Sequence, residues 1–218
     1  MKLNSNTKIV GRNVILVPYR EYHVPRYHEW MKSEDLQKLT ASEPLTLEEE
    51  YEMQKSWCED DDSKCNPRNN CYNIVFFKLL FYLTYLNYFY NLCSCNVISN
   101  FFMFSEAMIG DTNIFMTDNE ITAGEIEIMI AEEAARGKKL GWEAVILMLL
   151  YGVQHLNLKT IEAKISLTNI ISIKMFNKLG FEEKSTSDIF QEVTLEKIVN
   201  NEWVKWLNEQ AQYELQTC

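Results

Sequence analysis

Histidine and positive charge are both scarce in this sequence. The 218 residues include 3 histidines, and the formal net charge is -10. Without a basic surplus, the chain does not resemble a protein that neutralises nucleic-acid phosphates. The six cysteines form no C-x-x-C pair, and Cys93 and Cys95 lie too close together for half of a zinc site. We therefore expect no metal site, no nucleic-acid partner, and free thiols in a reducing compartment.

A long apolar run is missing at the start of the chain. Residues 1–6 do not lead into a hydrophobic stretch of signal-peptide length, which favours a cytoplasmic protein. Hydrophobic and charged contents of 47% and 24% are typical of a globular protein with one full core. The acidic surplus favours cationic substrates such as amines or basic peptides, although it also simply increases solubility.

Residues 66–104 lack Asp, Glu, Gly, Ala, Gln, His and Trp, and are rich in Phe, Tyr, Asn, Leu and Ile. This block is compatible with a strand, a buried helix or part of a membrane span. Residues 74–92 approach spanning length, but Lys78, Asn87 and several tyrosines make a poor span, so we expect no membrane association. Because AT-rich DNA encodes these residue types, our preferred interpretation is an atypical insertion derived from translated intron sequence.

Outside the block, strand and helix patterns alternate in the second half of the chain, as in a mixed sheet with crossover helices. Thr46 and Glu49 have the spacing of a capping box, which predicts a helix start there. The predicted strands cover residues 8–18 (with a turn inside), 106–116, 124–130, 160–166 and 190–195. The predicted helices cover residues 24–31, 46–57, 142–154 and 169–180, followed by a polar helical tail at 202–213.

The most informative segment lies between the strand at 124–130 and the helix at 142–154. It reads Arg136, Gly137, Lys138, Lys139, Leu140, Gly141. A strand, a basic turn with glycine and a helix start can hold a phosphate, because the first helical turn has unpaired N–H groups and a positive dipole end. Glycine lets the backbone approach an anion closely. Such turns also simply start helices, so this segment alone leaves both interpretations open.

A second motif follows one strand downstream, where residues 169–181 read Asn-Ile-Ile-Ser-Ile-Lys-Met-Phe-Asn-Lys-Leu-Gly-Phe. Together, the two motifs resemble the pyrophosphate loop and the Asn-to-Gly-Phe helix of the GCN5-related N-acetyltransferase superfamily. Segments outside these motifs resemble its N-acetyltransferase 9-like family. These segments are residues 16–19 (Leu-Val-Pro-Tyr), 27–33 (Tyr-His-Glu-Trp-Met-Lys-Ser), 39–48, 124–127 (Gly-Glu-Ile-Glu) and 190–195 (Phe-Gln-Glu-Val-Thr-Leu).

The resemblance implies an α/β (mixed α+β) acetyl-CoA acyltransferase fold. Its central, mostly antiparallel sheet contains a splayed pair of parallel strands and is flanked by helices. Residues 1–65 and 105–199 would form a single N-acetyltransferase domain, with 66–104 as the insertion and 200–218 as a helical tail. The implied reaction moves an acetyl group from acetyl-CoA to an amine, with a protein N-terminus as acceptor and tubulin as the partner class.

The resemblance also implies a cofactor site. Backbone groups from Gly137 to Gly141, including Lys138, Lys139 and Leu140, would hold the pyrophosphate with Arg136 nearby. The edge of Ile128, Met129 and Ile130 would bind the pantetheine arm, with the N–H near Met129 polarising the thioester carbonyl. Asn169 would contact the same arm or act only as a helix N-cap.

An ammonium substrate must lose a proton before it attacks, so a base is needed. The candidates are Glu125 and Glu127, which share one face of their strand; the alternative is that both are surface or ion-paired carboxylates. His28 is a further candidate, although a partly buried, hydrogen-bonded side chain is the simpler interpretation.

Two positions depart from the family pattern. Lysine replaces glycine at 139, and Phe176 stands where a tyrosine often protonates the thiolate, leaving Tyr151, water or unaided departure. A second hypothesis is therefore a catalytically weak protein that keeps the fold and binds a cytoskeletal partner. A third is a membrane-anchored form that uses residues 74–92.

Overall fold

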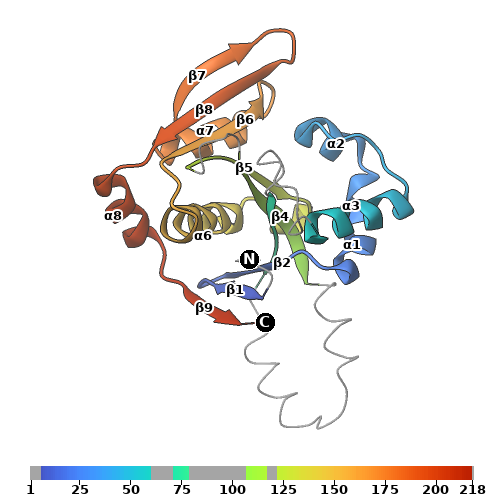
Figure 1. Cartoon of the computed structure of the whole chain (residues 1–218). Coiled ribbons are helices and arrows are strands. Elements are labelled where there is room, and N and C mark those ends of the chain that lie inside the picture. The colour runs from blue at the N-terminus through green and yellow to red at the C-terminus, as the bar shows by residue number, and fades with distance from the viewer. Residues whose placement is uncertain (1–5, 60–70, 79–106, 117–121, 218) are drawn as a thin grey trace.

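A single nine-stranded sheet organises the protein, whose computed structural model describes residues 6–59, 71–78, 107–116 and 122–217 (Figure 1). The strand order is β7-β8-β6-β5-β4-β3-β2-β1-β9. All neighbouring strands are antiparallel except β5 and β6. The strands are β1 (Thr7–Val10), β2 (Val14–Pro18), β3 (Cys71–Lys78), β4 (Met108–Met116), β5 (Ala123–Ile130), β6 (Thr160–Ser166), β7 (Glu182–Ser187), β8 (Glu192–Ile198) and β9 (Glu214–Thr217).

Helices cover both faces of the sheet, as the resemblance implies (Figure 1). They are α1 (Val24–Met31), α2 (Glu34–Thr40), α3 (Leu47–Glu59), α6 (Leu140–His155), α7 (Ile170–Lys178) and α8 (Asn201–Gln210), with 3-10 turns η1 (Glu21–His23) and η2 (Glu133–Ala135). Residues 144–152 of α6 are all buried, so this helix runs through the main core. A second, smaller core joins α1 and α2 to the opposite face of β4 and β5 through Trp30, Leu36, Met108 and Met129.

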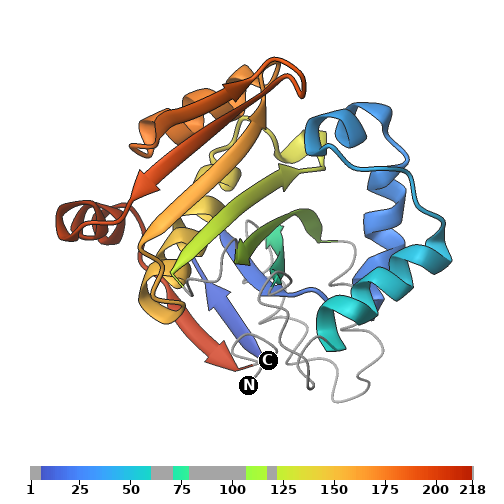
Figure 2. The same cartoon turned by 45° about the horizontal axis from the view of Figure 1, so that its top comes forward.

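The splayed pair of parallel strands is formed by β5 and β6. They pair only at Ala123 with Thr160, Gly124 with Ile161, and Glu125 with Glu162. Beyond these three pairs the two strands diverge, as Figure 2 shows. The expected fold, a mostly antiparallel sheet with one splayed parallel pair, is therefore confirmed.

Part of the atypical block is a central strand. Residues 71–78 form β3, which pairs with β2 from Val14 to Pro18 and with β4 from Met108 to Phe115. The strand alternative is thus correct for these eight residues, and the sheet has no open edge between β2 and β4. Residues 66–70 and 79–104 lie outside the described part of the chain. Among the residues that are described, no helix is long and apolar enough to cross a membrane.

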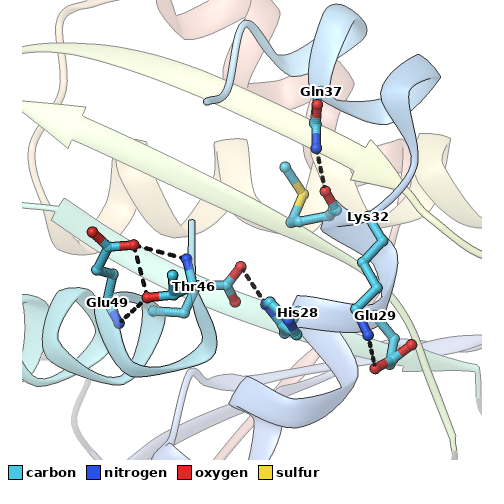
Figure 3. A network of polar contacts seen from close by, with 8 residues as sticks. His28, Glu29, Lys32, Gln37, Thr46 and Glu49 are labelled. Carbon is cyan, nitrogen blue, oxygen red and sulfur yellow. Dashed lines mark hydrogen bonds and ion pairs between the residues drawn. The ribbon is translucent and has the colours of Figure 1, made fainter. Parts of the chain in front are cut away.

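Several helix starts follow directly from the sequence. The capping box is present, because the Thr46 N–H donates to Glu49 Oε2 at 2.8 Å and the Glu49 N–H donates to Thr46 Oγ1 at 3.3 Å (Figure 3). Asn169 caps α7 by accepting from the Ser172 N–H at 3.1 Å. Both contacts satisfy N–H groups that have no partner inside the helix. The helical tail predicted for residues 200–218 is present only as α8, from Asn201 to Gln210. The prediction is wrong for the last residues, because Glu214–Thr217 form β9, whose backbone pairs with β1.

Lys139, which stands where the family pattern has glycine, lies in the turn before α6. Gly137 has φ +70 and Lys139, the N-cap of α6, has φ +61. Lys139 therefore adopts the left-handed conformation, which is unfavourable for a residue with a side chain. That conformation costs a non-glycine residue about 1–2 kcal/mol.

We predict that Lys139→Gly stabilises the protein. Relief of backbone strain is partly offset by the greater freedom of glycine in the unfolded chain, which leaves a net gain of about 0.5–1 kcal/mol. Urea unfolding should detect it as a higher midpoint. Lys139→Ala is the matched control, because it removes the same charge and keeps the strain. If the alanine variant were as stable as the glycine variant, strain at this position would not be the cause.

Candidate active site

The loop between β5 and α6 presents a row of backbone N–H groups to solvent. Gly137, Lys138 and Lys139 are exposed. No side chain caps the first turn of α6, and its first intrahelical bond is from the Glu143 N–H to the Lys139 carbonyl. Residues 136–139 form a turn, and the Lys139 N-cap makes no side-chain hydrogen bond to the first turn of the helix. Two lysines, two left-handed residues and a helix dipole therefore converge where an anion would be stabilised.

Arg136 holds this loop against the end of β5. Its Nε donates to the Ile130 carbonyl at 2.9 Å, and its Nη2 donates to the Ala131 carbonyl at 3.2 Å. The guanidinium thus fixes the loop, and direct contact with an anion stays a prediction. Gly141 completes the junction, since a Cβ there would lie 3.2 Å from the Cδ1 and Cγ1 atoms of Ile130. Leu140 is buried beside it in the main core.

The last residues of β5 form the edge predicted to bind an extended ligand. Ile128, Met129 and Ile130 lie beyond the last pair with β6 but remain paired with β4. Every second residue of an antiparallel strand points its N–H and C=O away from that partner. Beyond Glu125, the outward backbone groups of β5 no longer pair with β6. The strand therefore offers outward backbone groups at Ile128 and an outward N–H at Ile130, whose carbonyl accepts from Arg136, directly before the loop.

The side chains of β5 alternate between the two cores as predicted. Ile126, Ile128 and Ile130 pack against the main core around α6, and Met129 belongs to the smaller core. Glu125 and Glu127 therefore share the face that Met129 occupies. Of these two carboxylates, Glu125 is held by an ion pair with Lys164 at 2.6 Å.

Glu127 is in a different electrostatic setting. Its side chain reaches solvent, but the surrounding protein limits its hydration. This desolvation, followed by the charge of Glu125, raises the pKa of Glu127 to about 7. A water-accessible carboxylate whose pKa is near neutrality has the properties of a general base.

Two polar residues of β4 lie beside Glu127 and were not predicted as site residues. Asn113 is directly opposite Glu127, and Asp111 is opposite Met129. Asp111 and Asn113 are each only 5% exposed, and Asn113 Nδ2 donates to Asp111 Oδ2 at 3.2 Å. Burial, and then the charge of Glu127, raises the pKa of Asp111 to about 7. The sequence signal that could have identified them is the placement of two polar residues, Asp111 and Asn113, two positions apart in an otherwise apolar strand.

His28 is engaged by a buried carboxylate. Its Nδ1 lies 3.2 Å from Glu50 Oε1 (Figure 3). Desolvation raises the pKa of Glu50, while the His28 contact opposes the shift. The simpler interpretation of His28, as a partly buried and hydrogen-bonded side chain, is therefore confirmed. In the described part of the chain, no group of three or more His, Cys, Asp or Glu side chains could hold a metal ion.

The residues of the second motif are mainly structural. Asn169 is the N-cap of α7, which leaves its amide nitrogen for a ligand contact that stays a prediction. Phe176 is 2% exposed and packs edge-on against Phe181, with ring centroids 5.0 Å apart. Tyr151 is also buried in the main core, 5.2 Å from the ring of His155.

We predict that Asp111→Asn stabilises the protein at pH 8 but not at pH 4. The pKa of Asp111 is higher in the folded protein than the ordinary value of 3.8, so the folded state holds its proton more tightly. The wild-type protein therefore loses stability as the pH rises from about 4 through about 7. At pH 8 the variant should gain on the order of 2–4 kcal/mol in unfolding free energy.

Urea unfolding at both pH values tests this expectation. The exposed residue Asp188 supplies the matched control, because Asp188→Asn makes the same charge change and should show no such pH dependence. Equal stability of Asp111→Asn and the wild-type protein at pH 8 would contradict the buried, uncompensated carboxylate.

Comparison with known proteins identifies the family. Residues 13–182 match the family described as acetyltransferase (GNAT) domain. The chain is 50% identical to the human alpha/beta-tubulin-N-acetyltransferase 9, over 98% of this chain and 93% of the relative. It is 43% identical to the Drosophila melanogaster protein of the same name, over 99% and 98%. An N-acetyltransferase 9-like protein of Nematostella vectensis is 44% identical, over 92% and 90%.

Solved structures share the fold at low identity. Spermidine N-acetyltransferase from Vibrio cholerae, in complex with CoA and spermine, has a TM-score of 0.63 at 14% identity, covering 85% of this chain and 95% of that chain. The ribosomal L7/L12 α-N-protein acetyltransferase RimL, in complex with coenzyme A, has a TM-score of 0.62 at 12% identity, covering 86% and 94%. The chain therefore belongs to the acetyltransferase (GNAT) domain family, in its N-acetyltransferase 9-like branch.

Proposed function

We propose that this chain moves an acetyl group from acetyl-CoA to the α-amine of a protein N-terminus, with tubulin as the substrate. The observation that carries the proposal is the opened edge of β5, which leads directly into an exposed, glycine-bearing basic turn at the uncapped start of α6. The names of the human, mouse and Drosophila relatives support tubulin as the acceptor. A tubulin substrate also supports a cytoplasmic location.

The residues present fit coenzyme A. The N–H groups from Gly137 to Gly141 and the ammonium groups of Lys138 and Lys139 would hold the pyrophosphate. The edge from Ile128 to Ile130, apart from the Ile130 carbonyl that accepts from Arg136, would pair with the amides of the pantetheine arm, as an added strand does. Arg136 would keep the loop in register with this edge. Asn169, at the start of α7, would contact the arm from the side of β6.

When bound, acetyl-CoA supplies an acetyl carbon that is activated as a thioester. An amine attacks this carbon, so a C–N bond forms, the C–S bond breaks, and the sulfur leaves as the thiolate of coenzyme A. Glu127 takes the proton of the ammonium, directly or through water. The register with β4 turns the Met129 N–H towards Asp111, so the predicted donor near Met129 would be the outward N–H of Ile128 or Ile130. This N–H would donate to the carbonyl oxygen as charge develops there. Phe176 has no proton to give, so the thiolate leaves unaided or takes a proton from water.

Glu125 is the weaker candidate for the base, because its carboxylate is already paired with Lys164. We propose that the ion pair between Glu125 and Lys164 keeps β5 in the orientation in which Glu127 can accept the proton. We also propose one acetyltransferase domain in residues 1–65 and 105–199, joined by the strand β3 that the insertion at 66–104 contributes. Residues 200–218 close it, since β9 pairs with β1 at the edge of the sheet.

A second candidate function is a catalytically weak protein that binds a cytoskeletal partner. Two observations favour it: Lys139 keeps a left-handed conformation at the loop, and Phe176 is a buried core residue. Neither removes the N–H groups or Glu127 from the site. Calorimetry separates the two functions, because absence of binding at millimolar coenzyme A would remove the enzyme hypothesis.

We predict that Glu127→Gln lowers kcat about 100-fold or more, since loss of a general base typically costs about 10²–10⁴ in rate. The KM for acetyl-CoA should stay unchanged. In the wild-type protein, kcat/KM should rise with pH up to about 7, where Glu127 loses its proton. The variant should lose this rise. A steady-state acetylation assay with a tubulin amino-terminal peptide measures both quantities.

Glu125→Gln is the matched control, since it removes a neighbouring carboxylate from the same face of the same strand. We expect a reduction of less than about 10-fold, because this residue acts only through orientation and charge. A Glu127→Gln variant with wild-type kcat and pH profile would assign the base elsewhere.

A further inference from the structure

Beside Glu127, the polar face of β4 contains hydrogen-bond acceptors without donors. Asp111 Oδ1 and Asn113 Oδ1 are buried and have no hydrogen-bond partner in the described part of the chain. The side chains themselves are 95% buried, since each is only 5% exposed. A buried acceptor without a donor is costly, so such positions call for a donor that arrives from outside.

The neighbouring cations do not compensate Asp111. Arg26, in α1, pairs with Glu132 at 2.6 Å, and Lys164, in β6, pairs with Glu125 at 2.6 Å. Within the described residues, the only side-chain donor to Asp111 is the Asn113 amide. Among the described residues, Asp111 therefore pairs with no cation, although the charge of Lys164 partly offsets that of Glu127.

The groups that face Asp111 from the other elements add negative charge or are neutral. Glu127 faces it from β5. Tyr27, in α1, is raised in pKa by burial and then by the charges of Asp111, Tyr19, Glu50 and Glu127, so it stays a neutral phenol. Glu50, in α3, is paired with His28 through one oxygen, while its Oε2 is buried without a partner. The cluster of Asp111, Asn113 and Glu127 is thus rich in acceptors and negative in potential.

We propose that Asp111 and Asn113 form, with Glu127, the subsite that binds the ammonium group of the acceptor. This inference rests on the proposed function, since it assigns the amine side of the same reaction. An ammonium group has three N–H donors and one positive charge, and the three side chains offer acceptors from two adjacent strands. The product amide has no charge and fewer N–H donors. The subsite therefore holds the substrate more strongly than the product.

The arrangement also gives the carboxylates of Glu127 and Asp111 different roles. Glu127 is exposed to solvent and receives the proton, whereas Asp111 is buried. The arrival of an ammonium group would favour the charged form of Asp111 and so add charge attraction for the amine. Asn113 lies opposite Glu127 and donates to Asp111, so it links the two. Primary amines with a full positive charge are the ligand class that this subsite would select.

Peptide binding tests the proposal without turnover. The probe is a ten-residue peptide with the amino-terminal sequence of β-tubulin and a free α-amine, titrated by calorimetry into the full chain with and without coenzyme A. The same peptide with an acetylated amine is the ligand control. We expect the free amine to bind and the blocked amine to bind at least 10-fold more weakly. Asp111→Asn should weaken free-amine binding at least 10-fold, and Asn113→Leu should weaken it several-fold.

The outcomes separate this subsite from the proposed function. Coenzyme A binding should be unchanged in Asp111→Asn, and Asp188→Asn should leave both affinities unchanged. In the transfer assay, Asp111→Asn should raise the KM for the peptide and leave the KM for acetyl-CoA unaltered. Wild-type peptide affinity in Asp111→Asn, or equal affinity for free and blocked peptides, overturns the subsite while cofactor binding and transfer still stand. If the wild-type protein did not bind coenzyme A, the proposed function itself would instead be overturned.

Discussion

The short parallel contact between β5 and β6 is the constraint on which the site depends. Three residue pairs hold the two strands together before they separate. Because β5 remains paired with β4, the separation exposes backbone groups on one side of β5 only. It also brings the end of β5 and the start of α6 to the same place, where Arg136 and Gly141 hold the loop on Ile130. This one divergence of β5 from β6 thus creates both the edge and the loop that we propose bind coenzyme A, beside the face that carries Glu125 and Glu127.

The sequence predicted those features that depend on local pattern. The alternation in β5, the Thr46 capping box and the glycine-bearing turn before α6 all follow from neighbouring residues. Features that depend on distant pairing were not predictable in the same way. The burial of Asp111 depends on which strands flank β4, and the Arg136 side chain could not be assigned to the carbonyls of β5 rather than to an anion.

Stability and function are balanced differently on the two faces of the sheet. The face toward α6 is a continuous apolar core, whose buried side chains stabilise the fold. The opposite face carries Asp111, Asn113 and Glu50, which have buried oxygens without donors. Such groups reduce stability unless a ligand supplies the donors. The protein therefore concentrates its unfavourable polar burial on the face where we propose that the amine binds.

The position of β3 limits which shortened forms of this chain can exist. It stands fourth from the β9 edge, between β2 and β4. The backbone pairing between the N-terminal hairpin and the half of the sheet that contains β4 and β5 therefore passes through it. A protein translated from a transcript that skipped the codons for residues 66–104 would lack β3. Strands β2, β1 and β9 would then be separated from the other five strands, and β2 and β4 would each become an unpaired edge. Whatever the genetic origin of this tract, its strand β3 links the two halves of the sheet, and its excision should yield an aggregating product rather than a compact isoform.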